Sequence, residues 1–128
     1  MKVMLGGRWI WILSEEKPDY EITGKYLFFS TDQGKLIEIA TNEIESHGFH
    51  RAKVNMNLLE GQTEYVLCLY YKDDSRKKEL AERNRRDHGA KYRYWKSDEA
   101  TLRGDYSEEF LKKLSKSDRR YFTKPKGN

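Results

Sequence analysis

The chain has 128 residues, which is enough for one domain with a single hydrophobic core. Charged residues make up 36% and apolar residues 37%, and no apolar run reaches the roughly 18 residues of a transmembrane helix. No secretion signal is evident, and the single cysteine, Cys68, excludes an internal disulfide, so we expect an intracellular protein.

The first half of the chain predicts two strands and a helix. WIWIL at 9–13 and KYLFFS at 25–30 are short aromatic and β-branched runs, joined by a polar loop. Residues 30–48 predict a helix, in which Ser30 and Gln33 have the spacing of a capping box. Its apolar stripe at helical spacing consists of Leu36, Ile37, Ala40 and Ile44.

The second half alternates strands and helices. The predicted elements are strands at 49–55 and 64–71, a helix at 73–88, a strand at 91–96 and a short helix at 107–116. The 64–71 run is apolar on both faces, as in a central strand. Asp73, Asp74 and Ser75 offer caps for the 73–88 helix, and Gly89 ends it.

The order β β α β β α β α predicts a single small α+β domain over residues 1–128. We expect a mostly antiparallel sheet with two to three helices, in which neighbouring strand runs form hairpins. Residues 117–128 form a basic C-terminal tail, a candidate lid or a segment docked on a partner subunit.

Positive charge is concentrated in the second half. Residues 1–60 contain 7 Lys and Arg against 9 Asp and Glu, whereas residues 61–128 contain 18 against 12. Clustered cations favour anionic partners, although a solvated helix face with a basic tail explains the same distribution.

Catalytic and metal-binding patterns are missing from the sequence. His47 and His50 are the one close histidine pair, and further zinc ligands do not accompany them. Cys68 lies in the most apolar run, where a buried thiol is the usual outcome. Phosphate-loop, dinucleotide and nucleophile-elbow motifs are absent. We therefore expect no metal, no cofactor and no catalytic residue.

The stretch KYRYWKSDEATLRGDY at 91–106 places rings beside cations. Strand alternation predicts Tyr92 and Tyr94 on one face and Lys91, Arg93 and Trp95 on the other. Rings stack on bases and cations bind phosphates, so Trp95 with Lys96 is the leading pair for a nucleotide-like ligand. The alternative is an edge strand whose rings lie half-buried beneath Lys and Arg stems.

Segments 24–55, 63–84 and 91–114 resemble small phage and prophage proteins of the Thoeris anti-defence type, the first family of that name. The resemblance implies a sponge that binds a cyclic ADP-ribose isomer from a TIR-based defence system and leaves it intact. It also implies a homo-oligomer with ligand at subunit contacts, cyclic di- or trinucleotides at a separate site in some members, and action in the host cell cytoplasm. The apolar 9–13 strand is a candidate subunit contact.

We selected candidate site residues by matching side chains to the adenine, ribose and pyrophosphate groups of such a ligand. Tyr94 or Trp95 would stack on adenine, and Asp105 would bind ribose hydroxyls. Cations for the pyrophosphate are Lys96, Arg103, Arg119 and Arg120. Candidates for a second, cyclic-nucleotide site are Arg51, Lys53, Lys72 and Arg76.

Two other functions stay open. A small enzyme that cleaves a cyclic nucleotide would use the same rings and cations with His50, His88 or Asp105 as a general base. A generic nucleic-acid-binding module would bind oligonucleotides with a steep salt dependence. The net charge of +4 and the absence of a known motif disfavour long nucleic acid.

Overall fold

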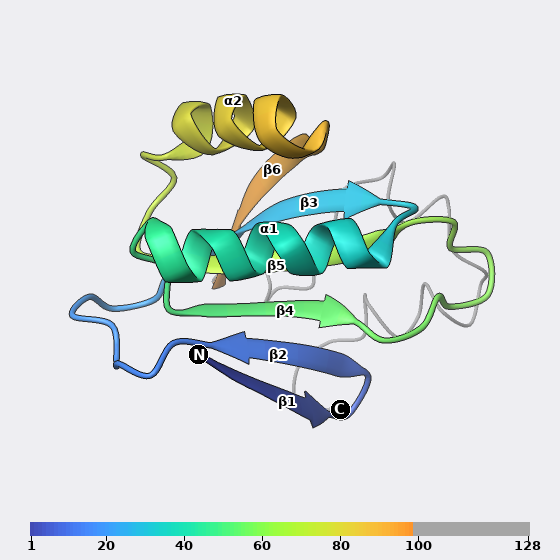
Figure 1. The fold of residues 1–128 in the computed structure, drawn as a ribbon, viewed down its shortest axis with the longest axis horizontal. Helices are drawn as coiled ribbons and strands as arrows, with labels where there is room; N and C mark the ends of the chain where they lie inside the picture. Colours follow the sequence, from blue (N-terminus) through green and yellow to red (C-terminus); the bar gives the residue numbers. More distant parts are fainter. Residues whose placement is uncertain (99–128) are drawn as a thin grey trace.

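The structure is a computed structural model that describes residues 1–98. They form an α+β fold with a six-stranded, wholly antiparallel sheet and two helices, which confirms the predicted class and order (Figure 1). The elements are β1 (Lys2–Gly6), β2 (Trp9–Leu13), β3 (Gly24–Ser30), α1 (Gln33–Ser46), β4 (Arg51–Asn55), β5 (Tyr65–Tyr71), α2 (Lys77–His88) and β6 (Lys91–Ser97). The helix predicted at 107–116 and the tail at 117–128 lie outside the described residues.

The strands lie in the order β1-β2-β4-β5-β3-β6, so β5 occupies the interior position that its apolar faces predict. β4 and β5 form the expected hairpin. The hairpin expected between β2 and β3 is wrong, because β2 pairs with β4, and β3 pairs with β5 and β6. β3 is buried on both faces over six of its seven residues, and only an interior position in the sheet supplies that cover.

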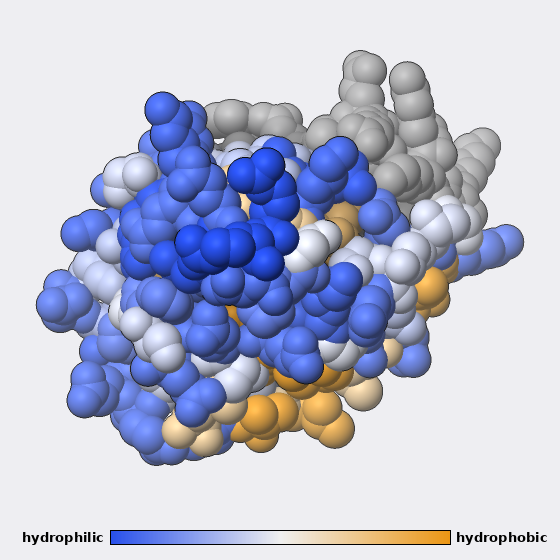
Figure 2. Space-filling view, turned by 45° about the horizontal axis from the view of Figure 1, so that its top comes forward, coloured by the Kyte–Doolittle hydropathy of each residue, from blue (hydrophilic) through white to orange (hydrophobic). Residues whose placement is uncertain are grey.

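β1 is a strand that our sequence analysis did not predict. It forms a hairpin with β2 through a two-residue connection in which Gly7 has a φ of 61°, a conformation that glycine adopts without strain. All five of its residues are exposed, including Val3, Met4 and Leu5. Figure 2 shows an apolar patch along the lower edge of the molecule, on the side where β1 lies in Figure 1.

α1 packs across one face of the sheet, which we call the proximal face (Figure 1). Residues from both helices and five strands bury their side chains there, among them Leu36, Ile39, Tyr26, Phe28 and Leu80. α2 lies beside β6 and contacts α1 through a buried polar network. This face therefore holds the main core.

The helix starts differ from the predicted ones. Asp32 caps α1, since its Oδ1 accepts a hydrogen bond from Lys35 N at 3.1 Å, whereas Ser30 Oγ accepts from Asp32 N. α2 begins at Lys77, and Asp73 instead closes the preceding turn by accepting from Ser75. The predicted end at Gly89 is confirmed by its left-handed φ of 63°.

The opposite face of the sheet, which we call the distal face, carries a second cluster. Its side chains are Trp9, Trp11, Lys25, Leu27, Phe29, Arg51, Lys53, Val66, Cys68, Tyr70, Tyr94 and Lys96. In β4, Arg51 and Lys53 lie on this face, whereas Ala52 and Val54 enter the proximal core, as strand alternation requires.

Neither helix among residues 1–98 combines the length and the apolar character that crossing a bilayer requires.

Candidate functional site

The ring-and-cation stretch of β6 divides between the two faces differently from the predicted alternation. Tyr94 pairs with Leu27, but Phe28 pairs with Tyr92, so β6 has one extra residue at this point. This bulge puts Tyr92 and Trp95 on the proximal face and Tyr94 on the distal face. The predicted grouping is therefore wrong, because one inserted residue inverts the faces of everything beyond it.

Trp95 and Lys96, the leading pair from the sequence, point to opposite faces. Trp95 packs edge-on against Tyr26, with ring centroids 4.9 Å apart, and belongs to the proximal core. Lys96 is only 5% exposed and lies on the distal face. The two side chains therefore cannot bind one small ligand from the same side of the sheet.

Trp95 also lines a surface hollow of about 540 Å³ at the edge of the sheet. Most of the polar residues around it are acidic: Glu21, Asp73, Asp74 and Asp98. Lys72 is the one cation of this lining, and its side chain lies near the rings of Tyr20 and Tyr71. An acidic rim repels phosphates, so this hollow is a poor site for an anionic ligand.

The distal face brings rings and cations together from strands that are distant in sequence. Lys53 on β4 places its Nζ 3.9 Å from the ring centre of Trp9 and 5.2 Å from that of Trp11. Both tryptophans belong to β2 and are partly buried. A cation over an indole face is an attractive arrangement, and a ring at a surface is also a stacking platform for a base.

Tyr70 on β5 is the centre of a second ring–cation group. Its ring stacks near that of Trp11, with centroids 6.3 Å apart and planes inclined by 17°. Lys25 Nζ lies 5.7 Å from the Tyr70 ring centre, and Arg51 Cζ lies 5.9 Å from it. The rings of Trp9, Trp11 and Tyr70 thus lie beside cations on the distal face, a composition that suits a ligand with a planar base and a phosphate.

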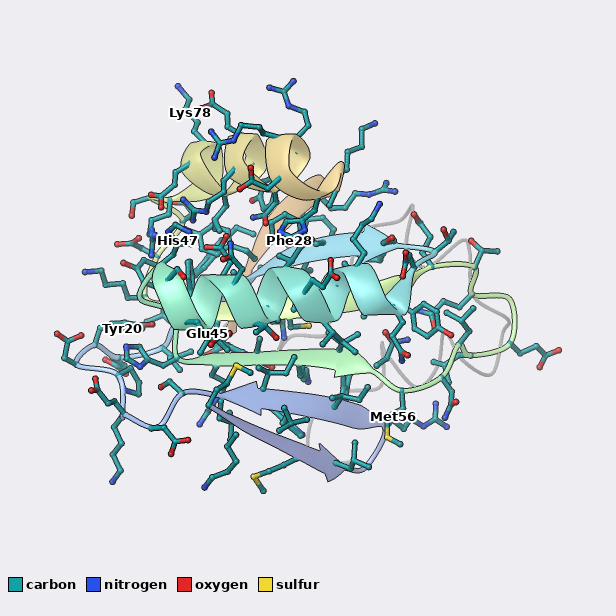
Figure 3. All side chains as sticks on the ribbon, viewed as in Figure 1. Tyr20, Phe28, Glu45, His47, Met56 and Lys78 are labelled. Carbon is teal, nitrogen blue, oxygen red and sulfur yellow. The ribbon has the colours of Figure 1, made fainter. Side chains whose placement is uncertain are left out.

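The four candidates for a second site do not lie together. Arg51 and Lys53 are on the distal face, whereas Arg76 lies at the start of α2 on the proximal side. Arg76 is committed to the fold: its guanidinium stacks on Phe49 at 4.5 Å, donates to His47 O at 2.7 Å and pairs with Glu79. Figure 3 shows His47 near the C-terminal end of α1.

Arg103, Asp105, Arg119 and Arg120 lie outside residues 1–98, so their nomination remains a prediction. Four of the predicted site residues within 1–98 lie together on the distal face: Tyr94, Lys96, Arg51 and Lys53. Sequence reasoning missed Trp9, Trp11, Tyr70 and Lys25. The alternation of tryptophan with isoleucine in WIWIL places both tryptophans on one face of the strand. The sequence does not show that this strand pairs with β4, which supplies Lys53.

The histidines make structural contacts. His50 Nδ1 lies 2.8 Å from Ser14 Oγ, which itself donates to Glu16 O at 2.6 Å. The serine hydroxyl therefore donates its proton to the Glu16 carbonyl and accepts a hydrogen bond from the histidine ring. An activated serine nucleophile would instead donate its proton to the ring nitrogen. His88 Nδ1 lies 3.8 Å from Glu38. Within residues 1–98, no three His, Cys, Asp or Glu side chains are grouped to hold a metal ion.

Cys68 is buried beneath the distal cations. Burial raises the pKa of its thiol, and the positive charges of Lys25 and Lys53 oppose that rise without cancelling it. A buried thiol with a raised pKa is a weak nucleophile, so Cys68 fits a packing role.

Comparison with models of known protein families, with curated proteins and with solved structures finds no match to this chain.

Proposed function

We propose that this protein binds an anionic, base-containing ligand on its distal face and holds it without chemical change. The observation that carries the proposal is the contact of Lys53 with Trp9 and Trp11, next to the Tyr70 group with Lys25 and Arg51. Rings supply stacking, which is worth about 1–3 kcal/mol per base, and cations supply charge-assisted hydrogen bonds of about 1.5–3 kcal/mol each.

The resemblance to the first Thoeris anti-defence family supplies the identity of the ligand in this proposal. A cyclic ADP-ribose isomer contains an adenine, two riboses and a pyrophosphate, which need a ring, polar groups and cations. The protein would act as a sponge in the host cytoplasm and deplete the signal by mass action. Cyclic di- or trinucleotides, with the same chemical groups, are the other ligands that the proposal admits.

A sponge has to bind tightly, and nanomolar affinity corresponds to about 12 kcal/mol. Stacking and a few charged hydrogen bonds reach that value only in an enclosed site. We therefore expect a second surface to cover the ligand on the side that faces away from the sheet. A second copy of the chain is the cover that we propose. The WIWIL strand that we nominated as the contact has its backbone paired on both sides, by β1 and by β4, so the free edge at this end of the described sheet belongs to β1.

The first test is ligand retention by the purified full-length chain. The protein is incubated with cyclic ADP-ribose isomers and with cyclic di- and trinucleotides, unbound ligand is removed, and the protein is denatured. Chromatography of the released material then separates three outcomes. Intact ligand supports the sponge. Altered products would make the protein an enzyme, and no depletion of any of these ligands would overturn the proposal.

A further inference from the structure

β1 forms an open edge of the described sheet. The strand order places it outside β2, and no other strand among residues 1–98 pairs with it. All five of its residues are exposed, with 57% of the surface accessible at Val3, 49% at Met4 and 69% at Leu5. A regular, apolar edge strand of this kind is a template on which another strand can pair.

β6, the strand at the opposite end of the described sheet, has features that discourage pairing. Its register with β3 shifts between Leu27 and Phe28, so it contains a bulge, and its sequence KYRYWKS carries three cations. Bulges and charges commonly protect a sheet edge. β1, in contrast, pairs with β2 in unbroken register and has Lys2 as its one charged side chain. β1 is therefore the edge that is suited to pairing.

The backbone of β1 directs hydrogen-bonding groups away from the sheet. On β2, Ser14 N donates to His50 O at 2.9 Å, so the even-numbered residues turn their backbone groups toward β4 and the odd-numbered ones toward β1. Met4 lies opposite the odd-numbered Trp11, so the hydrogen bonds of Met4 run to β2. The residues on either side of Met4 therefore point their N–H and C=O groups outward.

These outward groups, at Val3 and Leu5, are self-complementary. When two β1 strands run antiparallel with Met4 opposite Met4, Val3 of each copy lies opposite Leu5 of the other. Such a pair exchanges both of its N–H···O hydrogen bonds, so the outward groups of both residues are satisfied. Lys2 then lies opposite Gly6, so no like charges face each other across the contact.

The side chains favour the same pairing. Val3 lies opposite Ile12, a fully buried residue of the proximal core, so Val3 and Leu5 share the proximal side of the sheet. Pairing of two copies would join their Val3 and Leu5 side chains into one apolar row and remove part of it from water. The exposed apolar surface along the lower edge in Figure 2 lies on this side of the molecule.

We propose that β1 is a dimerisation strand, on which a second copy of the chain pairs antiparallel about Met4 to form one continuous sheet. This inference goes beyond the proposed function, because the contact needs no ligand. The distal faces of both copies then lie on the same side of the joined sheet, with the two Met4 side chains between their Trp11 rings. The edge-paired copy lies beside a ligand on the distal face, so the copy that covers the ligand is a further one.

Disulfide cross-linking of the full-length chain tests the register. The two Met4 residues would form a pair without mutual hydrogen bonds, with Cα atoms about 4.5 Å apart, which a disulfide can span. Without ligand and under mild oxidation, Met4→Cys should form covalent dimers at least about 10-fold faster than Leu58→Cys, at an exposed loop leucine. Cys68 is buried in both proteins.

Val3→Cys is the control for the register. In the proposed pairing the two Val3 residues are diagonal neighbours about 7–8 Å apart, too far for a disulfide, so this variant should cross-link no faster than Leu58→Cys. Equal rates in Met4→Cys and Leu58→Cys, or a faster rate in Val3→Cys than in Met4→Cys, would overturn the proposal.

Amide hydrogen exchange of the unmodified chain identifies what occupies the edge. The Val3 and Leu5 amides should exchange fast in dilute protein and become protected in concentrated protein, whereas the Met4 amide, bonded to β2, should be protected in both. Fast exchange at every concentration would show an empty edge. Slow exchange in protein that sediments as a monomer would show that residues outside 1–98 cover it, and either result contradicts the proposal. Neither experiment uses a nucleotide, so a failure of ligand retention leaves this inference standing.

Discussion

The ammonium of Lys53 lies 3.9 Å from the centre of the Trp9 ring, which joins β4 to β2 on the distal face. The two residues are separated by more than forty positions in the chain and lie in paired strands. This contact holds a cation at the surface beside an aromatic platform. A phosphate is a stronger partner for the ammonium than an indole ring, so ligand binding should draw Lys53 away from Trp9.

Removing either member of this contact should weaken ligand retention. We expect Lys53→Met to cost about 1.5–3 kcal/mol of binding free energy, from one charged hydrogen bond, and Trp9→Leu about 1–3 kcal/mol, from lost stacking. Equilibrium dialysis with the retained nucleotide measures both losses. Lys78→Met, on exposed α2 surface, is the matched control and should bind as wild type does. Unchanged affinity in both site variants would place the ligand elsewhere.

Self-association should depend on the exposed apolar edge of β1. Leu5 is 69% exposed and Val3 57%, and an uncovered apolar edge strand is a template for pairing with another chain. We expect Leu5→Lys to shift the protein toward the monomer, because charges on an edge strand oppose pairing. Sedimentation velocity gives the populations of the species. Leu58→Lys, at a leucine that is 39% exposed in a loop, should leave them unchanged.

Gly24 of β3 lies against the backbone of β6. A Cβ added there would lie 2.7 Å from Lys96 O and 2.9 Å from the Cα of Ser97, and it would also meet the Trp95 ring. Because the obstacle is backbone, we expect Gly24→Ala to destabilise the fold by about 1–3 kcal/mol. Urea denaturation measures the change. Gly34→Ala in α1, where the nearest atom is 3.4 Å away, should instead be neutral or stabilising.

The ion pair between Glu43 and Arg83 should dominate the contact between the helices. Glu43 is fully buried and accepts from Arg83 Nη2 at 2.6 Å and Nε at 2.9 Å. Glu43→Leu should cost about 3–5 kcal/mol, because it removes two hydrogen bonds from the half of the Arg83 guanidinium that Glu79 does not reach and also takes the carboxylate acceptor from the buried Asn84 amide. The double variant Glu43→Leu with Arg83→Met should recover most of that loss, since it removes both charges. A double variant no more stable than the single one in urea titration would contradict this reading.

Stability should fall in acid because of Glu79. Hydrogen bonds from Arg76 and then Arg83 lower the pKa of this carboxyl from 4.5 to about 2. The folded state therefore holds fewer protons than the unfolded state between these values, so stability is full above pH 4.5 and is lost as the pH falls toward 2. Glu79→Gln should flatten the dependence of the urea midpoint on pH in this window. Glu82→Gln, at an exposed position of the same helix, should change the slope less.

Local sequence patterns were enough to locate most strands and helices. WIWIL forms β2 over the predicted residues, and the apolar run at 64–71 forms the interior strand β5, because its side chains need cover on both faces. Arg51 and Lys53 of β4 share one face, which follows from the two-residue period of a strand. The missing strand β1 had a readable signal in Gly6 and Gly7, which close a hairpin onto β2.

What the sequence determined by itself is the type and place of most elements among residues 1–98 and, within each regular strand, which side chains share a face. Both follow from short-range periodicity. The tertiary structure alone decided that β3 lies between β5 and β6, that a bulge separates Tyr92 from Tyr94, and that Lys25 faces Lys96. These are consequences of strand pairing between distant segments, which local periodicity does not encode. The candidate site depends on them, because its rings come from β2 and β5 and its cations from β3, β4 and β6.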